Sequence, residues 1–278
     1  MSKHLKRLAV PRSWSIPRKT NVYTTKPRPG AHPIERALPL STFLRDHLRL
    51  VATGREAARV VGAGDVLVDG RVVKDPKFAV GFMDSISVPK VGKAWRVSID
   101  EKARLRLVPI GAQDAGWKLA RVQDKTTISG GRTQLNLHDG RNLLVKKDDY
   151  ATGDVLKVEL PSQKVLGHFP LKEGAQVLIT DGRHAGEVAP VKAIEVTRSH
   201  KPNLIHLTAA DASFTTVKHY AFPIGDKSNL PSGAEERSGT ALERRPATPA
   251  TPASPPAAEA PAPRPARSKS PEVKPIVS

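Results

Sequence analysis

The sequence has 278 residues, no cysteine, and 45 lysines and arginines against 27 acidic residues, which gives a net charge of +18. At about 150 residues per domain, the length suits two domains or several small ones. The lack of cysteine excludes a disulfide scaffold, thiolate metal sites and a cysteine nucleophile. The positive charge favours a polyanion, with nucleic acid first and an anionic membrane surface second. No apolar run approaches the ~20 residues of a membrane span, and no signal-peptide core follows the N-terminus. We therefore expect a soluble protein that is not exported.

Residues 1–40 form a basic extension with nine cationic residues, six prolines and one acid, Glu35. So many prolines prevent a long helix, and so few apolar residues predict a segment that stays disordered until RNA orders it. Trp14 or Tyr23 would then stack on a base or sugar. The alternative is a solvated leader that binds nothing. The candidate RNA-binding residues here are Lys3, Lys6, Arg7, Arg12, Trp14, Arg18, Lys19, Lys26 and Arg28.

Two helices are predicted between Leu40 and Gly64. Apolar residues recur at helical spacing over 40–51, and Thr53 with Glu56 has the spacing of a capping box that opens the second helix. We expect Gly62 and Gly64 to end it. Each helix carries two arginines one turn apart, about 5.4 Å, which suits successive RNA phosphates. These pairs are Arg45 with Arg49 and Arg55 with Arg59.

A β-hairpin follows at once. Apolar residues 66–68 and 71–73 flank Asp69-Gly70, which is a strong hairpin signal, and 86–88 predict another strand. Arg71 and Lys74 would extend the cationic surface of the helices. The alternative is an ordinary solvated face, because Arg45 lies beside Asp46 in the sequence and Arg55 beside Glu56. That alternative is less favoured because two consecutive helices and a hairpin all carry cationic residues in the same arrangement.

Residues 96–170 predict a small all-β body. Strand patterns occur at 104–108, 133–137, 142–145 and 154–160, with a second Asp-Gly hairpin at Asp139-Gly140. Acidic residues at 148, 149 and 154 lie beside lysines, and we interpret them as a solvated charge cluster, not a metal site.

Residues 171–228 predict a third β unit with a glycine-bracketed loop. This loop resembles a KOW element, and the resemblance implies a glycine with positive φ that lets the loop approach RNA backbone, with Gly182, Arg183, His184 and Gly186 as the candidate residues. The alternative is a tight hairpin without a ligand. Residues 229–278 are rich in proline and alanine and nearly balanced in charge, which predicts a disordered tail.

Known catalytic signatures are missing from the sequence. It contains no zinc-protease HExxH, no phosphate-binding GxxxxGK[ST] and no GxSxG nucleophile motif. We therefore expect no enzymatic activity, no cofactor and no bound metal.

Several of these segments resemble known RNA-binding modules. Leu44-Arg-Asp-x-Leu48, Glu56-Ala-Ala and the stretch 64–73 resemble the S4-type RNA-binding fold, and the continuation 77–84 narrows the resemblance to the archaeal and eukaryotic small-subunit ribosomal protein family S4e. Arg18-Lys19 and Phe222-Pro-Ile-Gly225 agree with that family. The glycine loop resembles a KOW element. The resemblance covers about residues 1–228, whereas the proline-alanine tail is an addition to the family pattern.

The resemblance implies an α+β protein of several modules. These are a basic extension (1–40), an S4-type domain of a helix pair and β-ribbon (41–95), an all-β central domain (96–170), a β-barrel-like KOW module with C-terminal strands (171–228) and the tail (229–278). It implies a cytoplasmic, non-catalytic ribosomal protein whose partners are small-subunit rRNA and neighbouring ribosomal proteins, with no membrane and no small-molecule substrate. Two alternatives stay open: an RNA-modifying enzyme with the same N-terminal module, and a KOW-containing translation or transcription factor.

Overall fold

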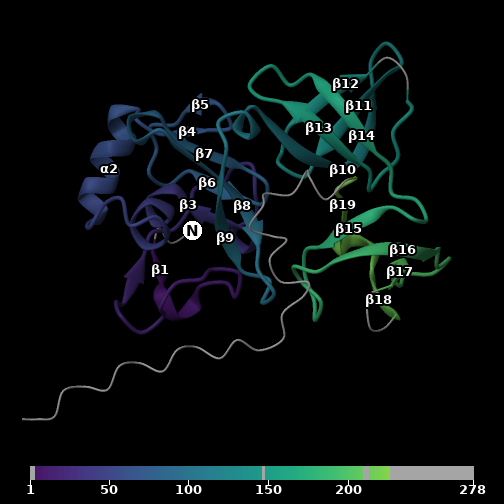
Figure 1. Ribbon diagram of the computed structural model, residues 1–278, viewed down its shortest axis with the longest axis horizontal. Coiled ribbons are helices and arrows are strands. Elements are labelled where there is room, and N and C mark those ends of the chain that lie inside the picture. Colours follow the sequence, from purple (N-terminus) through teal and green to yellow (C-terminus); the bar gives the residue numbers. More distant parts are fainter. Residues whose placement is uncertain (1–3, 146–147, 209–212, 226–278) are drawn as a thin grey trace, which may run out of the picture. The chain divides into compact units, whose positions relative to one another are not determined.

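The computed structural model describes residues 4–145, 148–208 and 213–225 (Figure 1). Lys3 and the expected tail at 229–278 lie outside these residues. The described part contains three five-stranded sheets, two two-stranded pairs and short helical segments. None of its helices has the length and apolar character needed to cross a membrane.

The first sheet has the strand order β5-β4-β7-β8-β9 and packs with the helices. Its strands are β4 (Leu67–Val68), β5 (Arg71–Val72), β7 (Ser85–Val88), β8 (Lys93–Ile99) and β9 (Leu105–Ile110). The two small pairs are β1 (Leu5–Lys6) with β2 (Tyr23–Thr24) and β3 (Ala37–Pro39) with β6 (Ala79–Gly81). The α-helices are α1 (Leu40–Thr42) and α2 (Gly54–Ala63). The 3₁₀ turns are Arg7–Ala9, Ile34–Arg36, Pro89–Val91, Asp114–Gly116 and Lys218–Tyr220.

The first predicted helix is shorter than expected. After α1 the chain widens into a π-helical turn, Phe43–His47, where the Leu48 N–H donates to the Phe43 carbonyl at 2.9 Å. Arg49 then has a φ of 53°, which takes it out of the helix. The prediction that Arg45 and Arg49 lie one turn apart on a helix is therefore wrong, because the helix ends between them.

The second helix and the hairpin are confirmed. Thr53 and Glu56 form the predicted capping box of α2. Gly64, with a φ of 84°, ends the helix, whereas Gly62 lies inside it. Asp69 and Gly70 both have positive φ (50° and 73°), as a two-residue turn between β4 and β5 requires.

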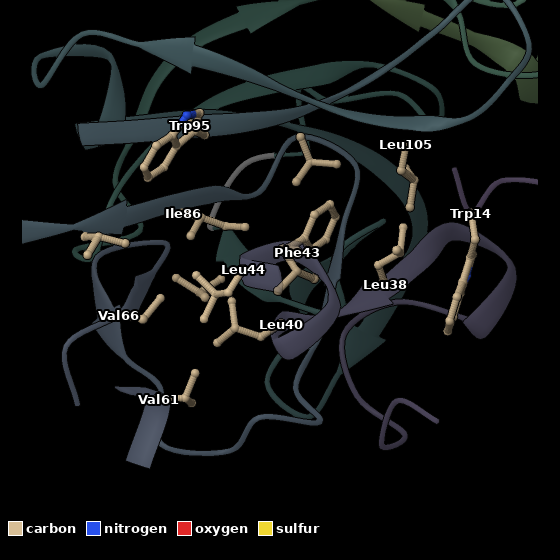
Figure 2. Close-up of a cluster of buried hydrophobic side chains, with 14 of the residues drawn as sticks. Trp14, Leu38, Leu40, Phe43, Leu44, Val61, Val66, Ile86, Trp95 and Leu105 are labelled. Carbon is tan, nitrogen blue, oxygen red and sulfur yellow. The ribbon is translucent and has the colours of Figure 1, made fainter. Parts of the chain in front are cut away.

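The N-terminal extension packs into the first hydrophobic core (Figure 2). Val10, Trp14 and Ile16 are buried there, and the Trp14 Nε1–H donates to the Ile34 carbonyl at 3.1 Å. The prediction that the extension stays disordered until RNA orders it is therefore wrong for residues 4–40. The extension by itself has too few apolar residues to fold, but the rest of the chain supplies the apolar surface that covers it.

The expected domain boundary between residues 95 and 96 falls inside β8. This strand and β9 pair with β7 in one antiparallel sheet. Trp95, Val97 and Leu105 also belong to the same buried cluster as Phe43 of the π-helical turn. The first sheet therefore continues to Ile110.

The second and third sheets confirm the expected β structure beyond this point. The second has the order β12-β11-β10-β13-β14, and the third β18-β17-β16-β15-β19. The strands of the second are β10 (Trp117–Ile128), β11 (Arg132–Leu137), β12 (Asn142–Val145), β13 (Val155–Glu159) and β14 (Val165–Phe169). Those of the third are β15 (Gln176–Ile179), β16 (Val188–Glu195), β17 (Leu204–Thr208), β18 (Ser213–Val217) and β19 (Ala221–Pro223). Their arrangement can be followed in Figure 1.

The glycine of the segment Phe222–Gly225 has a packing role. A side chain at Gly225 would place its Cβ 2.3 Å from the Phe169 ring, at a φ of 69°. Any larger residue there would clash with the ring and would also strain the backbone.

Candidate nucleic-acid interface

The exposed arginines of α2 are free of carboxylate partners. Arg55 and Arg59 make no salt bridge with any described residue. Their neighbour Glu56 is occupied, because its carboxylate accepts from the backbone N–H groups of Ala52 at 2.9 Å and Thr53 at 3.4 Å. These backbone hydrogen bonds lower the pKa of Glu56. The capping box thus engages Glu56 with the backbone, and Arg55 and Arg59 stay exposed, although the charge of Arg59 also lowers the pKa of Glu56.

Arg45, by contrast, is paired. It donates through Nε and Nη2 to the two carboxylate oxygens of Asp46, at 2.8 and 2.9 Å. Burial opposes the charge on Asp46, but the hydrogen bonds from Arg45 outweigh burial and lower the pKa of that carboxyl. Arg7 lies 3.8 Å from the same carboxylate and is only 3% exposed. The charges of Arg45 and Arg7 are therefore compensated by Asp46, whereas Arg55 and Arg59 of α2 have no such partner among the described residues.

An open groove of about 690 Å³ brings these groups together. Its walls include Arg7 from the extension, Arg45 and Arg49 around the first helix, and Gly54 at the start of α2. A Cβ at Gly54 would stand 3.7 Å from Nη1 of Arg45. Three guanidinium groups face two carboxylates, those of Asp46 and Glu56, so the groove keeps an excess of positive charge.

The hairpin adds two exposed cations beyond the C-terminus of α2. Arg71 and Lys74 are both exposed, and the Lys74 Cε would lie 3.8 Å from a Cβ at Gly64. Gly64 caps α2, so Lys74 lies beside the end of the helix where the macrodipole favours a positive charge.

The other basic residues of the extension divide by exposure. Lys6, Arg12, Lys19 and Arg28 are exposed, although Arg28 pairs with Asp75 at 2.9 Å. Arg18 and Lys26 are half-buried. Arg18 donates to the carbonyls of Leu8 and Pro11.

Two predicted contacts of the extension need correction. Trp14 is only 2% exposed and cannot stack on a base without leaving the core. Arg7 is buried and donates to the Pro17 carbonyl. The aromatic residue that remains available is Tyr23, which is 55% exposed and lies 5.8 Å from the His4 ring.

The glycine loop of the third sheet has the predicted positive φ values, but its close neighbour is the protein's own backbone. Gly182 and Gly186 have φ values of 95° and 81°. A Cβ at Gly186 would lie 3.0 Å from the Asp100 carbonyl carbon, so its close backbone neighbour is the protein itself. His184 stacks on Phe214 at 4.0 Å and pairs with Glu187 at 3.1 Å. Of the predicted set, Gly182 and Arg183 are exposed, and no described residue forms an ion pair with Arg183.

Sequence reasoning missed a buried charge cluster around Lys118 of β10. The ammonium group lies 2.7 Å from Asp69, 2.9 Å from Asp84 and 2.5 Å from Asp139, and the lysine is 1% exposed. Arg141 adds a second cation, 2.6 Å from Asp69. Asp69 and Asp139 are the acids of the two predicted Asp-Gly turns. Both turns were recognised from the sequence, but nothing in it showed that their carboxylates face inward to the same lysine.

His32 completes the charge balance of this cluster. Its Nε2 lies 2.9 Å from Asp84, and it is 6% exposed. Burial lowers the pKa of His32, but the charge of Asp84 outweighs burial and raises it above the usual value. Burial likewise opposes charge on Asp84, yet His32 and Lys118 hold the pKa of that carboxyl far below its usual range. A protonated His32 with Lys118 and Arg141 would balance the three aspartates.

The cluster is structural and not a metal site, because its carboxylates are occupied by cations. Within residues 4–145, 148–208 and 213–225, no group of three or more potential metal ligands is arranged to hold an ion.

Comparisons with known proteins agree along the chain. The ribosomal family S4e matches residues 91–165, the RS4NT domain residues 1–35 and the S4 domain residues 38–86. The chain is 48% identical over 235 residues to small ribosomal subunit protein eS4 of Methanothermobacter thermautotrophicus, covering 83% of this chain and 97% of that protein. It is 43% identical over 224 residues to the protein of the same name from Archaeoglobus fulgidus, covering 81% and 94%.

A solved structure is similar as well. It is the crystal structure of the 30S ribosomal protein S4e from Thermoplasma acidophilum, with a TM-score of 0.62 and 34% identity. The match covers 69% of this chain and 97% of that one.

Proposed function

The chain belongs to the S4e family of small-subunit ribosomal proteins, and from this premise we propose that it is a non-catalytic constituent of the small ribosomal subunit that binds rRNA through cationic surfaces. Its partners would be small-subunit rRNA and neighbouring ribosomal proteins, and its place the ribosome in the cytoplasm.

The observation that carries this proposal is the uncompensated pair Arg55 and Arg59 on the exposed face of α2. Two guanidinium groups one helical turn apart match the spacing of successive phosphates, and each can bind a phosphate bidentately. Arg71 and Lys74 extend the surface along the hairpin, and the groove lined by Arg45 and Arg49 extends it toward the extension. These residues would therefore supply one extended contact to RNA backbone, with the buried Arg7 and Trp14 supporting it.

The third sheet supports a second contact. We propose that it is the KOW module expected from the sequence, and that Arg183 is its phosphate-binding residue, since His184 is held by Phe214 and Glu187.

The test is binding of the full-length protein to small-subunit rRNA fragments over a salt series. The matched variants replace Arg55 and Arg59 with Ala in one protein and with Lys in another. Contacts to about six to ten phosphates would reduce affinity by ~10³–10⁵-fold between 50 and 200 mM salt. Affinity that is independent of salt, or absent at low salt, would contradict the proposal.

Co-sedimentation with the 30S particle distinguishes the alternatives. A structural protein stays on the particle in high salt. A free pool that turns over RNA would instead favour the RNA-modifying enzyme, and a free pool bound to transcription or translation complexes would favour the KOW factor.

A further inference from the structure

A second cationic feature lies inside the protein, in a cavity of about 460 Å³. The N-terminal extension and all three sheets contribute to its walls. Arg36 comes from the extension, Arg121 and Gln123 from β10, and His219 from the turn before β19. None of the residues placed in the proposed RNA surface lines this cavity.

The two arginines of the cavity lack a counter-ion among the described residues. Arg121 is 6% exposed, and its Nη1 donates to the backbone carbonyl of His219 at 2.6 Å. Neither Arg121 nor Arg36 forms a salt bridge with any carboxylate in the described part of the chain, although Glu35 and Asp181 line the same cavity. Burial lowers the pKa of Arg121 to about 10, and the charge of Arg36 adds to this effect. An anion between the two groups would relieve the repulsion.

The rest of the cavity wall indicates what the anion is attached to. A lone phosphate would leave most of the space empty, and the volume falls within the ~300–1,000 Å³ of small-ligand sites. Three aromatic rings are among the lining residues: Phe82 and Phe222 pack edge to face at 5.0 Å, and His138 lies 5.7 Å from Phe222. Gln123 adds an amide that can pair with a base edge. Guanidinium groups next to aromatic and amide surface suit a nucleotide, with phosphate at one end and base at the other.

We propose that this cavity receives one unstacked nucleotide of the bound RNA, with its phosphate between Arg36 and Arg121. This inference rests on the proposed function, since RNA loops and bulges are the source of such a nucleotide. It adds a site of single-nucleotide recognition to a surface that otherwise contacts backbone.

The first experiment titrates the full-length protein with adenosine and uridine monophosphates and follows the side-chain NMR signals of His138 and His219. Saturable shifts are expected with the monophosphates and not with the nucleosides. Arg36→Gln should weaken this binding about 10-fold or more, because a charged hydrogen bond to phosphate is lost. Gln123→Glu should weaken it through repulsion at an exposed position, and Arg106→Gln, exposed on β9 and outside the cavity, should leave it unchanged.

The second experiment asks whether an rRNA fragment displaces the monophosphate from the cavity. Displacement, and weaker rRNA binding by Arg36→Gln, would support the proposal. Normal rRNA binding with no saturable shift at either histidine would overturn the cavity proposal while the proposed function stands. Nucleotide binding that RNA does not displace would overturn RNA as the source. Loss of rRNA binding by the unsubstituted protein would overturn the proposed function itself.

Discussion

The interior around Lys118 and the outer face of α2 both carry cationic side chains. These side chains differ in burial and in pairing with carboxylates. Lys118 is 1% exposed and lies within 3 Å of three aspartates, whereas Arg55 and Arg59 are exposed and unpaired among the described residues. A buried charge must be matched by opposite charge, as at Lys118, or by hydrogen bonds to backbone carbonyls, as at Arg121, because desolvation in the interior is not repaid otherwise. An exposed charge needs no partner and remains available to a ligand. Net charge alone therefore does not locate a binding surface.

The largest expected effect comes from Lys118. Lys118→Met would leave Asp69, Asp84 and Asp139 buried without their shared ammonium group, with Arg141 and His32 as the remaining cations, and we expect a loss of about 3–5 kcal/mol in the free energy of unfolding at pH 7. Urea denaturation measures this loss. The control is Lys102→Met at an exposed position, where a change within about 0.5 kcal/mol is expected. Equal stabilities of the two variants would show that the cluster is not a stabilising network.

Trp14 and Tyr23 provide a matched aromatic pair in the extension. Trp14→Ala should lower stability by about 3 kcal/mol, because it empties a core position. Tyr23→Ala should leave stability nearly unchanged and weaken RNA binding, since stacking on one base is worth about 1–3 kcal/mol. Denaturation and RNA titration of both variants give the two readouts. If Trp14→Ala kept full stability and lost RNA binding instead, the buried position of the ring would be contradicted.

The pH dependence of the unfolding free energy provides a test of the buried histidine His138. Burial lowers the pKa of His138 to about 3, whereas the unfolded chain titrates near 6.5. Between these values the unfolded state binds more protons, so stability is full above pH 6.5 and falls as the pH drops. From pH 6.5 to 5, His138 should account for a loss of about 2 kcal/mol.

His138→Gln should reduce this slope, measured by urea denaturation at half-unit pH steps. Burial also lowers the pKa of His47 and His219, so part of the slope should remain. The raised pKa of His32 acts above pH 6.5, where its contribution is lost as the pH rises, and it does not interfere in this window. Superimposable pH profiles of variant and parent would contradict a buried neutral His138.

The smallest energetic effect is expected on α2. Replacing Arg55 and Arg59 with Ala should reduce the slope of log affinity against log salt by about 1.4–1.8, because two phosphate contacts are lost. The circular dichroism spectrum and the unfolding free energy should not change, since neither arginine has a described protein partner. The Lys pair should retain the slope. An unchanged slope in the Ala pair would mean that this face of α2 is only solvated.

Several features were predictable from short stretches of sequence. The capping box at Thr53 and Glu56, the two Asp-Gly hairpins and the strand patterns depend on contacts between residues close in the chain. Local spacing and turn chemistry determine such elements, so they were predicted at nearly the right residues. Resemblance to the S4e family added the order of the modules.

Other features were not visible locally. Arg45 and Arg49 are four residues apart, yet Arg45 lies inside a π-helical turn and Arg49 follows its end with a positive φ. The long strand β10 lacks clean alternation because Lys118 and Arg121 point inward, where Lys118 meets three aspartates and Arg121 donates to the backbone carbonyl of His219. A pattern of apolar and polar residues cannot reveal a polar residue whose partners come from other sheets.

By itself the sequence determined the charge of the protein, its turns, its capping signals and the family to which it belongs. Tertiary structure decided which charges are available: it buried Arg7, Lys118 and Arg121, covered Trp14, and left Tyr23, Arg55 and Arg59 outside. The physical reason is that burial depends on surfaces from distant segments, and the cost of burying a charge or an aromatic ring is settled only where those segments meet.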